Sequence, residues 1–192
     1  MNNLLGVVLC GGESRRMGRD KGMLLQENKP WAIYMADKLV SFRVPVVFSI
    51  NQRQWEAYST LIPAGQLVID SLELPGPLKG LLSVHKKFPD KDLLLLACDM
   101  IDLDDGTIRK AIGAYCEEME GPGETSDFFV YQEDRFAQPF CGIYTANGLL
   151  QAAVTLGGQG QHDFSFQGLL GKGKTRRLMI DRPEAFTNYN TV

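Results

Sequence analysis

The chain has 192 residues, of which 44% are hydrophobic and 22% charged, and it carries a formal net charge of −3 at pH 7. This length is below the size at which proteins normally split into several domains, so we expect residues 1–192 to form a single domain. The small negative charge argues against a nucleic-acid partner, because neutralising a nucleic-acid backbone needs a broad excess of Lys and Arg. The longest apolar runs, such as LLLLAC at 93–98, are far shorter than the roughly 20 residues of a membrane-spanning helix, so we expect no membrane partner.

The first half of the chain alternates apolar runs of strand length with segments of helical periodicity. The predicted strands are 4–9, 44–50, 66–70 and 92–99, and the predicted helices between them are 30–42, 54–62 and 77–85. In the first of these helices, Trp31, Met35 and Leu39 recur at helical spacing. Strands that are apolar on both faces are typical of a parallel sheet covered by helices on both sides.

Beyond Asp99 the pattern is less regular, although strands and helices continue to alternate. The predicted elements are a helix at 104–119, short strands at 128–131 and 140–144, a helix at 163–170 and a strand at 175–180. The whole pattern predicts an α/β protein of Rossmann-like architecture, with three layers (α/β/α) and a mostly parallel central sheet.

The cysteines and histidines show no spacing that indicates a metal site. The four cysteines, which have no CxxC spacing, are Cys10, Cys98, Cys116 and Cys141. We therefore expect buried, reduced thiols in a cytoplasmic protein and no disulfide pair. Neither His85 nor His162 lies in a catalytic setting, and we expect surface or helix positions for both.

Polar residues follow the predicted strands, at the edge of the sheet where ligands of such folds bind. They are the segment 10–21, Asn51, Asp70 and Asp99. A carboxylate directly after LLLLAC suits Mg²⁺, which takes one or two carboxylates together with substrate phosphates. A helix cap is the simpler explanation for a single aspartate there. The second strand-end carboxylate, Asp70, favours a ligand site.

The segment 10–21 combines glycines with positive charge. Glycines after a strand let backbone N–H groups approach phosphate oxygens, and Arg15, Arg16 and Lys21 can add charge-assisted hydrogen bonds. A plain tight turn with solvated charges is the alternative, but the density of glycine and arginine favours an anion site. The segment lacks both GxxxxGK[ST] and GxGxxG, which argues against a P-loop ATPase and a nicotinamide dehydrogenase.

The same segment carries a family resemblance. The run LCGGESRRMGRDK at 9–21 resembles the signature L-A-G-G-x-S-x-R-M-G-x-D-K of the molybdenum cofactor guanylyltransferase family, with Cys10 where the family usually has Ala. Five later stretches are similar to family motifs in the same order: VVFSINQ, VIDS, LPGPLKGLLSV, LLACDM and NYNT. The first signature is shared with cytidylyl- and sugar nucleotidyltransferases, and the PGPLKG stretch points to the guanylyl branch.

The resemblance implies a nucleotide-diphospho-sugar transferase-like fold and an enzyme that transfers GMP from GTP to molybdopterin or Mo-molybdopterin. Pyrophosphate would leave, molybdopterin guanine dinucleotide would form, and Mg²⁺ would be the cofactor. It also allows transient contacts with other molybdenum cofactor biosynthesis proteins.

The resemblance further implies roles for individual residues. The nucleotide-binding residues would be Leu9, Cys10, Gly11, Gly12, Lys21, Asn51, Asp70 and Asp99. The catalytic residues would be Arg16 and Lys21 on the triphosphate and Asp99 on Mg²⁺. Support on the acceptor side would come from Gln138, Asn188 and Asn190.

Two alternatives stay open. One is another Mg²⁺-dependent nucleotidyltransferase, which attaches CMP to molybdopterin or activates a sugar phosphate; the PGPLKG stretch argues against it. The other is a non-catalytic binding module of molybdoenzyme assembly. Retention of Lys21, Asp99 and both late asparagines argues against that module, because a scaffold has no need of a metal-binding carboxylate.

Overall fold

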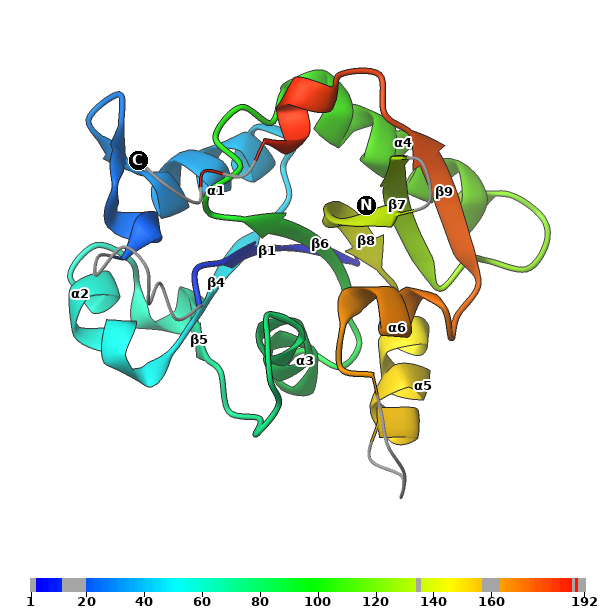
Figure 1. Ribbon diagram of the computed structural model, residues 1–192, viewed down its shortest axis with the longest axis horizontal. Coiled ribbons are helices and arrows are strands. Elements are labelled where there is room, and N and C mark those ends of the chain that lie inside the picture. Colours follow the sequence, from blue (N-terminus) through cyan, green and yellow to red (C-terminus); the bar gives the residue numbers. More distant parts are fainter. Residues whose placement is uncertain (1–2, 12–19, 134–135, 157–162, 188, 190–192) are drawn as a thin grey trace.

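The computed structural model describes residues 3–11, 20–133, 136–156, 163–187 and 189. Its centre is a seven-stranded sheet with the strand order β5-β4-β1-β6-β8-β7-β9 (Figure 1). The strands are β1 (Leu4–Leu9), β4 (Val46–Ile50), β5 (Leu67–Ile69), β6 (Asp92–Ala97), β7 (Phe128–Glu133), β8 (Phe136–Tyr144) and β9 (Thr175–Met179). Strand β8 runs antiparallel to both of its neighbours, and the other pairings are parallel. The prediction of a mostly parallel sheet is therefore confirmed.

Helices cover both faces of this sheet. In Figure 1, α1 (Trp31–Ser41) and α4 (Asp105–Glu120) lie on one face, and α3 (Leu78–Lys87), α5 (Ala146–Leu156) and α6 (Phe166–Leu170) lie on the other. The remaining elements are α2 (Trp55–Ser59), the 3-10 helices η1 (Lys21–Met23), η2 (Gln52–Gln54), η3 (Ala64–Gln66) and η4 (Pro183–Phe186), and the hairpin β2 (Leu25–Gln26) and β3 (Lys29–Pro30). This arrangement confirms the three-layer α/β/α architecture.

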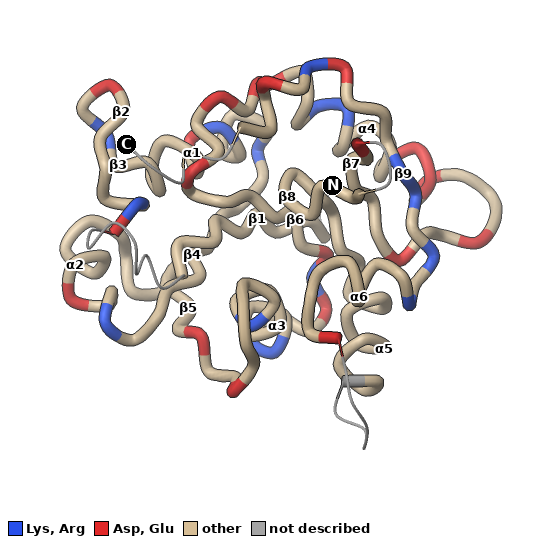
Figure 2. Tube along the Cα trace, viewed as in Figure 1, with Lys and Arg blue, Asp and Glu red and all other residues tan. Residues whose placement is uncertain are grey.

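Alternation along β1 produces the two apolar cores. Leu4 and Val8 pack into the core under α1 and α4, whereas Leu5 and Val7 pack into the core against α3 and α5. Successive side chains of a strand point to opposite faces, so a strand with a core on each side must be apolar at nearly every position. Full burial of each such side chain stabilises the fold by roughly 1.5–3 kcal/mol. The charged residues accordingly lie away from β1 and β4 (Figure 2).

Helix α5 and the β2–β3 hairpin were not predicted from the sequence. Helix α5 has no charged residue to mark a solvent face, and its start depends on tertiary contacts: the backbone N–H of Ala146 donates to Asp92 at 2.7 Å. The β2–β3 hairpin turns at Glu27 and Asn28, whose φ angles are 52° and 63°. Asn is among the residues that adopt this left-handed conformation most readily, so Asn28 was a turn signal in the sequence.

Candidate active site

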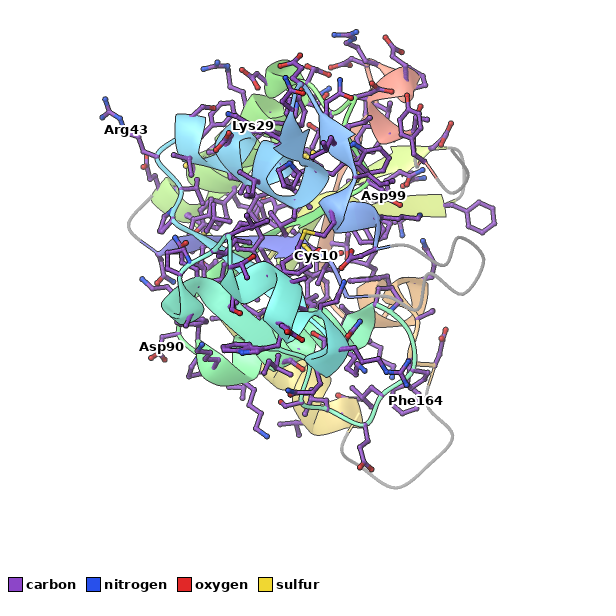
Figure 3. All side chains as sticks on the ribbon, turned by 90° about the vertical axis from the view of Figure 1, so that its left-hand side faces the viewer. Cys10, Lys29, Arg43, Asp90, Asp99 and Phe164 are labelled. Carbon is purple, nitrogen blue, oxygen red and sulfur yellow. The ribbon has the colours of Figure 1, made fainter. Side chains whose placement is uncertain are left out.

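The carboxyl ends of four parallel strands meet at one edge of the sheet. Leu9 of β1 lies opposite Ser49 of β4 and Ala97 of β6, and β5 continues the row beyond β4. The predicted site residues that follow these strands are Cys10 and Gly11, Asn51, Asp70 and Asp99. Figure 3 shows Cys10 and Asp99 in the middle of the molecule, where β1 and β6 end. The fold thus assembles the predicted strand-end residues along one edge.

An ion pair joins the segment after β1 to the end of β6. Lys21 Nζ lies 2.7 Å from Asp99 Oδ2, and the two side chains are 17% and 14% exposed. The residues are 78 positions apart in the chain. Asp20 holds Lys21 in place by capping η1, since its carboxylate accepts from the backbone N–H of Gly22 at 3.0 Å. A cation and a carboxylate, both only partly exposed, therefore face each other at the carboxyl edge of the sheet.

Asp70 is the second carboxylate of this edge. Ser49 Oγ donates to Asp70 Oδ1 at 2.7 Å. Burial raises the pKa of Asp70, while the Ser49 hydrogen bond and the charge of Lys79 act in the opposite direction. Gly11 lies so close that a Cβ atom there would be 2.6 Å from Asp70 Oδ2. A glycine is therefore required at position 11 to let the Asp70 carboxylate stand against the β1 end.

The N–H groups of Cys10 and Gly11 both donate to the Ser49 carbonyl oxygen, at 2.9 and 3.0 Å. These two groups are consequently used inside the sheet and are not the donors for a phosphate. The Cys10 side chain is buried, and burial together with the neighbouring Cys98 thiol raises the pKa of Cys10. Leu9 is buried in the core as the last residue of β1. A contribution of Leu9, Cys10 and Gly11 to a ligand would thus be one of backbone shape.

A cavity of about 780 Å³ opens beside these residues. Its walls come from the ends of β1, β4 and β5 and from the loop that holds the PGP stretch: Gly11, Asn51, Gln52, Arg53, Asp70, Leu74, Pro75, Gly76, Pro77 and Lys79. The volume falls within the range of roughly 300–1,000 Å³ that is usual for small-molecule sites. The cavity brings the PGPLKG stretch and three predicted nucleotide-binding residues, Gly11, Asn51 and Asp70, to the same place.

Asn51 caps η2. Its side-chain oxygen accepts from the backbone N–H groups of Arg53 at 2.9 Å and Gln54 at 3.2 Å. A carbonyl oxygen has two lone pairs, so these hydrogen bonds occupy it. Any side-chain hydrogen bond from Asn51 to a ligand would therefore be donated by Nδ2.

Of the remaining predicted site residues, one lies on β8 and the others lie outside the described residues. Gln138 lies on β8, which runs antiparallel to β6, so the first residues of β8 lie at the edge where β6 ends. Gln138 Nε2 donates to Glu133 Oε2 at 3.1 Å. Gly12, Arg16, Asn188 and Asn190 lie outside the described residues, as does His162.

Tyr189, the described residue between the two late asparagines, lies against the site. Its backbone N–H makes a long hydrogen bond of 3.5 Å to the carbonyl oxygen of Asp99, and its hydroxyl donates to Asp102 at 2.5 Å. The Tyr189 ring packs edge-on against Trp31, with 6.0 Å between centroids. This part of the chain end therefore meets the loop that follows β6.

Within the described part of the chain, no three His, Cys, Asp or Glu side chains are grouped so that they could hold a metal ion. Asp99 offers a single carboxylate, which Lys21 already neutralises in part. Such a site suits Mg²⁺, which needs only one or two protein carboxylates when phosphate oxygens supply other ligands. It does not suit a structural ion, which needs a closed set of protein ligands.

The family profile of the MobA-like NTP transferase domain matches residues 6–171. The chain belongs to this family. The matched residues include the β1 end, the cavity loop and the β6 end. Both the recognition of the family from its motifs and the assignment to a family of transferases are thereby confirmed.

Two curated relatives have related names. The chain is 28% identical over 142 residues to the molybdenum cofactor biosynthesis bifunctional protein of Synechocystis sp.. That match covers 74% of this chain and only 39% of that protein. The chain is also 27% identical over 192 residues to the probable molybdenum cofactor guanylyltransferase of Nostoc sp.. This second match covers 100% of this chain and 88% of that protein.

Among solved structures, molybdopterin-guanine dinucleotide biosynthesis protein A from Archaeoglobus fulgidus has the same fold, with a TM-score of 0.72 and 19% sequence identity. The match covers 97% of this chain and 92% of that one. The family fold therefore extends over nearly the whole chain.

Three further properties bear on the sequence predictions. The four cysteines are free thiols, and of these Cys10, Cys98 and Cys141 are buried while Cys116 is half-buried. His85 lies in α3, as a helix position predicts, but it is buried at 6% exposure. Each helix in the described ranges is too short or too polar to cross a membrane.

The sequence predicted no individual role for Gln54, Ser49 or Lys79, nor for Asp20 within the segment 10–21. Gln54 did carry a signal, because Asn51 and Gln54 have the spacing of a capping box, in which the two side chains bond reciprocally to each other's backbone N–H groups. Lys79 lies inside the PGPLKG stretch, where its charge faces the cavity.

Proposed function

We propose that the protein transfers GMP from GTP to molybdopterin or Mo-molybdopterin and releases pyrophosphate. The observation that carries the proposal is the Lys21–Asp99 pair at the same carboxyl edge of the sheet as a cavity of about 780 Å³ that Asn51 and Asp70 line. The family membership and the names of the relatives from Nostoc and Synechocystis support it.

In this reaction an oxygen of the acceptor's terminal phosphate forms a bond to the α-phosphorus of GTP. The bond between that phosphorus and the oxygen bridging to the β-phosphate breaks, and pyrophosphate leaves with the electron pair. Two anions must approach each other, so the barrier is dominated by charge repulsion and alignment. No side chain needs to act as a nucleophile.

Lys21 would hold the triphosphate. Its ammonium group is already positioned by Asp99 and by the η1 cap at Asp20, so binding does not have to order a free side chain. Arg16 would supply a second positive charge to the same phosphates as part of this proposal. Positive charge at the phosphates stabilises the negative charge that builds up on the leaving pyrophosphate.

Asp70 and Asn51 would bind the nucleoside in the cavity. Guanine presents N–H donors at its N1 and 2-amino positions, and ribose presents hydroxyl donors; a carboxylate in the cavity wall accepts from either. Asn51 Nδ2 would add a donor. Cytosine lacks the paired N–H donors of guanine, so an Asp70–base contact would favour GTP over CTP.

Mg²⁺ would be held by the Asp99 carboxylate and by phosphate oxygens of the substrate. When bound, it supplies positive charge that offsets the repulsion between the two phosphate groups. Asp99 would then have two tasks, positioning Lys21 and providing the metal with its protein oxygen.

The acceptor would approach from the side of β8 and the chain end. Gln138, Asn188 and Asn190 are the residues we propose for that side, and the contact of Tyr189 with the Asp99 carbonyl oxygen supports the placement. Reduced thiols fit a cytoplasmic location, and transient contacts with other molybdenum cofactor biosynthesis proteins complete the proposal.

A nucleotide panel tests this function. Thermal unfolding with Mg²⁺ and GTP, CTP, UTP or ATP should show protection by GTP above the others, because ligand binding to the folded state raises its stability. Pyrophosphate release should then require both GTP and molybdopterin. Preferential use of CTP would favour cytidylyl transfer, and release with a sugar phosphate would favour sugar activation. Nucleotide binding without pyrophosphate release from any of them would favour a non-catalytic module.

A further inference from the structure

Gln54, the last residue of η2, uses both ends of its side-chain amide. Its Nε2 donates to the carbonyl oxygen of Cys10 at 2.9 Å and to Asp20 Oδ2 at 2.8 Å. Its Oε1 accepts from the backbone N–H of Asn51 at 2.8 Å. One half-buried side chain thus bonds to three segments that are separate in sequence: the end of β1, the start of η1 and the residue after β4.

Each partner of Gln54 is, or directly precedes, a residue of the proposed nucleotide site. Cys10 precedes Gly11 in the cavity wall, Asp20 precedes Lys21, and Asn51 itself lines the cavity. A shift of any one of these segments would change the position of a ligand contact. The Gln54 amide therefore connects, through hydrogen bonds, the residues proposed to bind the nucleoside with the segment that holds Lys21, which is proposed to bind the phosphates.

The Asp20 end of this network is fixed from a second direction. The hydroxyl of Tyr58 donates to Asp20 Oδ1 at 3.2 Å, and the Tyr58 side chain is fully buried. Burial raises the pKa of Tyr58, so it remains a neutral hydroxyl donor. Gly22 makes room for it, because a Cβ atom at position 22 would collide with the Tyr58 hydroxyl oxygen. Asp20 thus has little freedom to move independently of Gln54.

The chemistry at position 54 demands an amide of this length. A leucine of similar size would leave the Cys10 carbonyl oxygen and Asp20 Oδ2 without the donor that Gln54 supplies. A glutamate would keep an acceptor for the Asn51 N–H but would turn a carboxylate toward another carboxylate. We infer that Gln54 is a positioning residue for nucleotide binding, which aligns Lys21 with the cavity that holds Asn51 and Gly11; this inference rests on the proposed function.

A double-mutant cycle on GTP affinity tests it. GTP binding is titrated calorimetrically with Mg²⁺ for the wild type, Gln54→Leu, Lys21→Ala and the double variant. We expect Gln54→Leu to weaken GTP about tenfold, the scale of leaving buried polar groups unpaired. Because Gln54 acts through the position of Lys21, the double variant should lose less affinity than the product of the two single losses. If Gln54→Leu only lowered the general stability of the protein, the two losses of GTP affinity would instead multiply.

The matched control is Gln66→Leu, since Gln66 is also the last residue of a three-residue 3-10 helix but is exposed. It should bind GTP as the wild type does. If Gln54→Leu fails to fold, Gln54→Glu replaces it and should also lose affinity about tenfold.

Native GTP affinity in the Gln54 variant, or fully multiplicative losses in the cycle, would overturn the inference while leaving the proposed function intact. A wild-type protein that binds no GTP would overturn both.

Discussion

A carboxylate lies at or just beyond each end of strand β6, and the two differ in what surrounds them. Asp92, its first residue, is 4% exposed and accepts from the Tyr115 hydroxyl at 2.6 Å and the Ala146 N–H at 2.7 Å. These neutral donors come from α4 and from the start of α5, so Asp92 joins the helix layers on opposite faces of the sheet. Asp99, just past the other end, pairs with the cation Lys21.

The comparison separates a structural carboxylate from one that we propose binds a ligand. Both are acidic residues at the ends of an apolar strand, and the sequence pattern around them looks alike. Asp92 lies at the amino edge of the sheet, where it accepts hydrogen bonds from groups of the protein itself. Asp99 lies at the carboxyl edge, where ligands bind in folds of this type, and its partner is a charge that a phosphate can share.

The largest effect should come from Asp99→Asn. The change removes the charge that would hold Mg²⁺ and orient Lys21, so turnover should fall by roughly two or more orders of magnitude, the scale of losing one preorganised electrostatic group. The melting temperature and much of the GTP affinity should stay. Asp90→Asn is the control, because Asp90 is exposed at the periphery of the molecule (Figure 3). Near-native turnover in the Asp99 variant would contradict the metal assignment.

At the other end of β6, Asp92→Ala should act on stability. Loss of the carboxylate leaves the Tyr115 hydroxyl and the Ala146 N–H without their acceptor, at a cost of about 1–3 kcal/mol. Urea unfolding measures the loss, and GTP affinity of the folded fraction should equal that of the wild type. A variant that unfolds at the wild-type urea concentration but binds GTP poorly would reverse the roles of the two carboxylates.

Lys21→Ala sharpens the contrast on the side of the ligand. If Lys21 contacts the triphosphate, GTP should bind about tenfold or more weakly, the scale of a hydrogen bond to a charged group, while guanosine binding should barely change. Lys29→Ala is the matched control, since it breaks a lysine–aspartate pair of 2.6 Å that is exposed. Equal losses for GTP and guanosine would place Lys21 away from the phosphates.

The smallest effect concerns Asp70 and pH. Burial raises the pKa of Asp70 in the folded protein above its ordinary value of 3.8, so between that value and the raised one the folded state holds more protons than the unfolded chain. The contribution of Asp70 to stability is therefore lost as pH rises through this window. Asp70→Asn should raise the melting temperature slightly at neutral pH and not at pH 3, while it weakens GTP binding. A variant that is destabilised at neutral pH would contradict the assigned cause of the shift.

Much of the fold could be read from the chain. The strand at 4–9 was predicted to the residue and the strand predicted at 92–99 is two residues shorter, because burial on both faces forces an uninterrupted apolar run. The helix predicted at 77–85 from Pro77 at its start is α3, which runs two residues further, to Lys87. Segment 9–21 carried the family signature, and Asp70 and Asp99 stood out because a carboxylate directly after an apolar strand is conspicuous.

Other features depend on contacts between distant segments. The place of β8 between β6 and β7, and its antiparallel direction, follow from packing that no local pattern records. The bonds of Gln54 to Cys10 and Asp20 span 44 and 34 positions of the chain. The local sequence determines which segments form strands buried on both faces and which residues follow those strands. This is because the pattern of apolar residues involves only residues that are close together in the chain. Which carboxylate becomes structural and which faces a ligand depends on the edge of the sheet where each one lies, and folding alone establishes that edge.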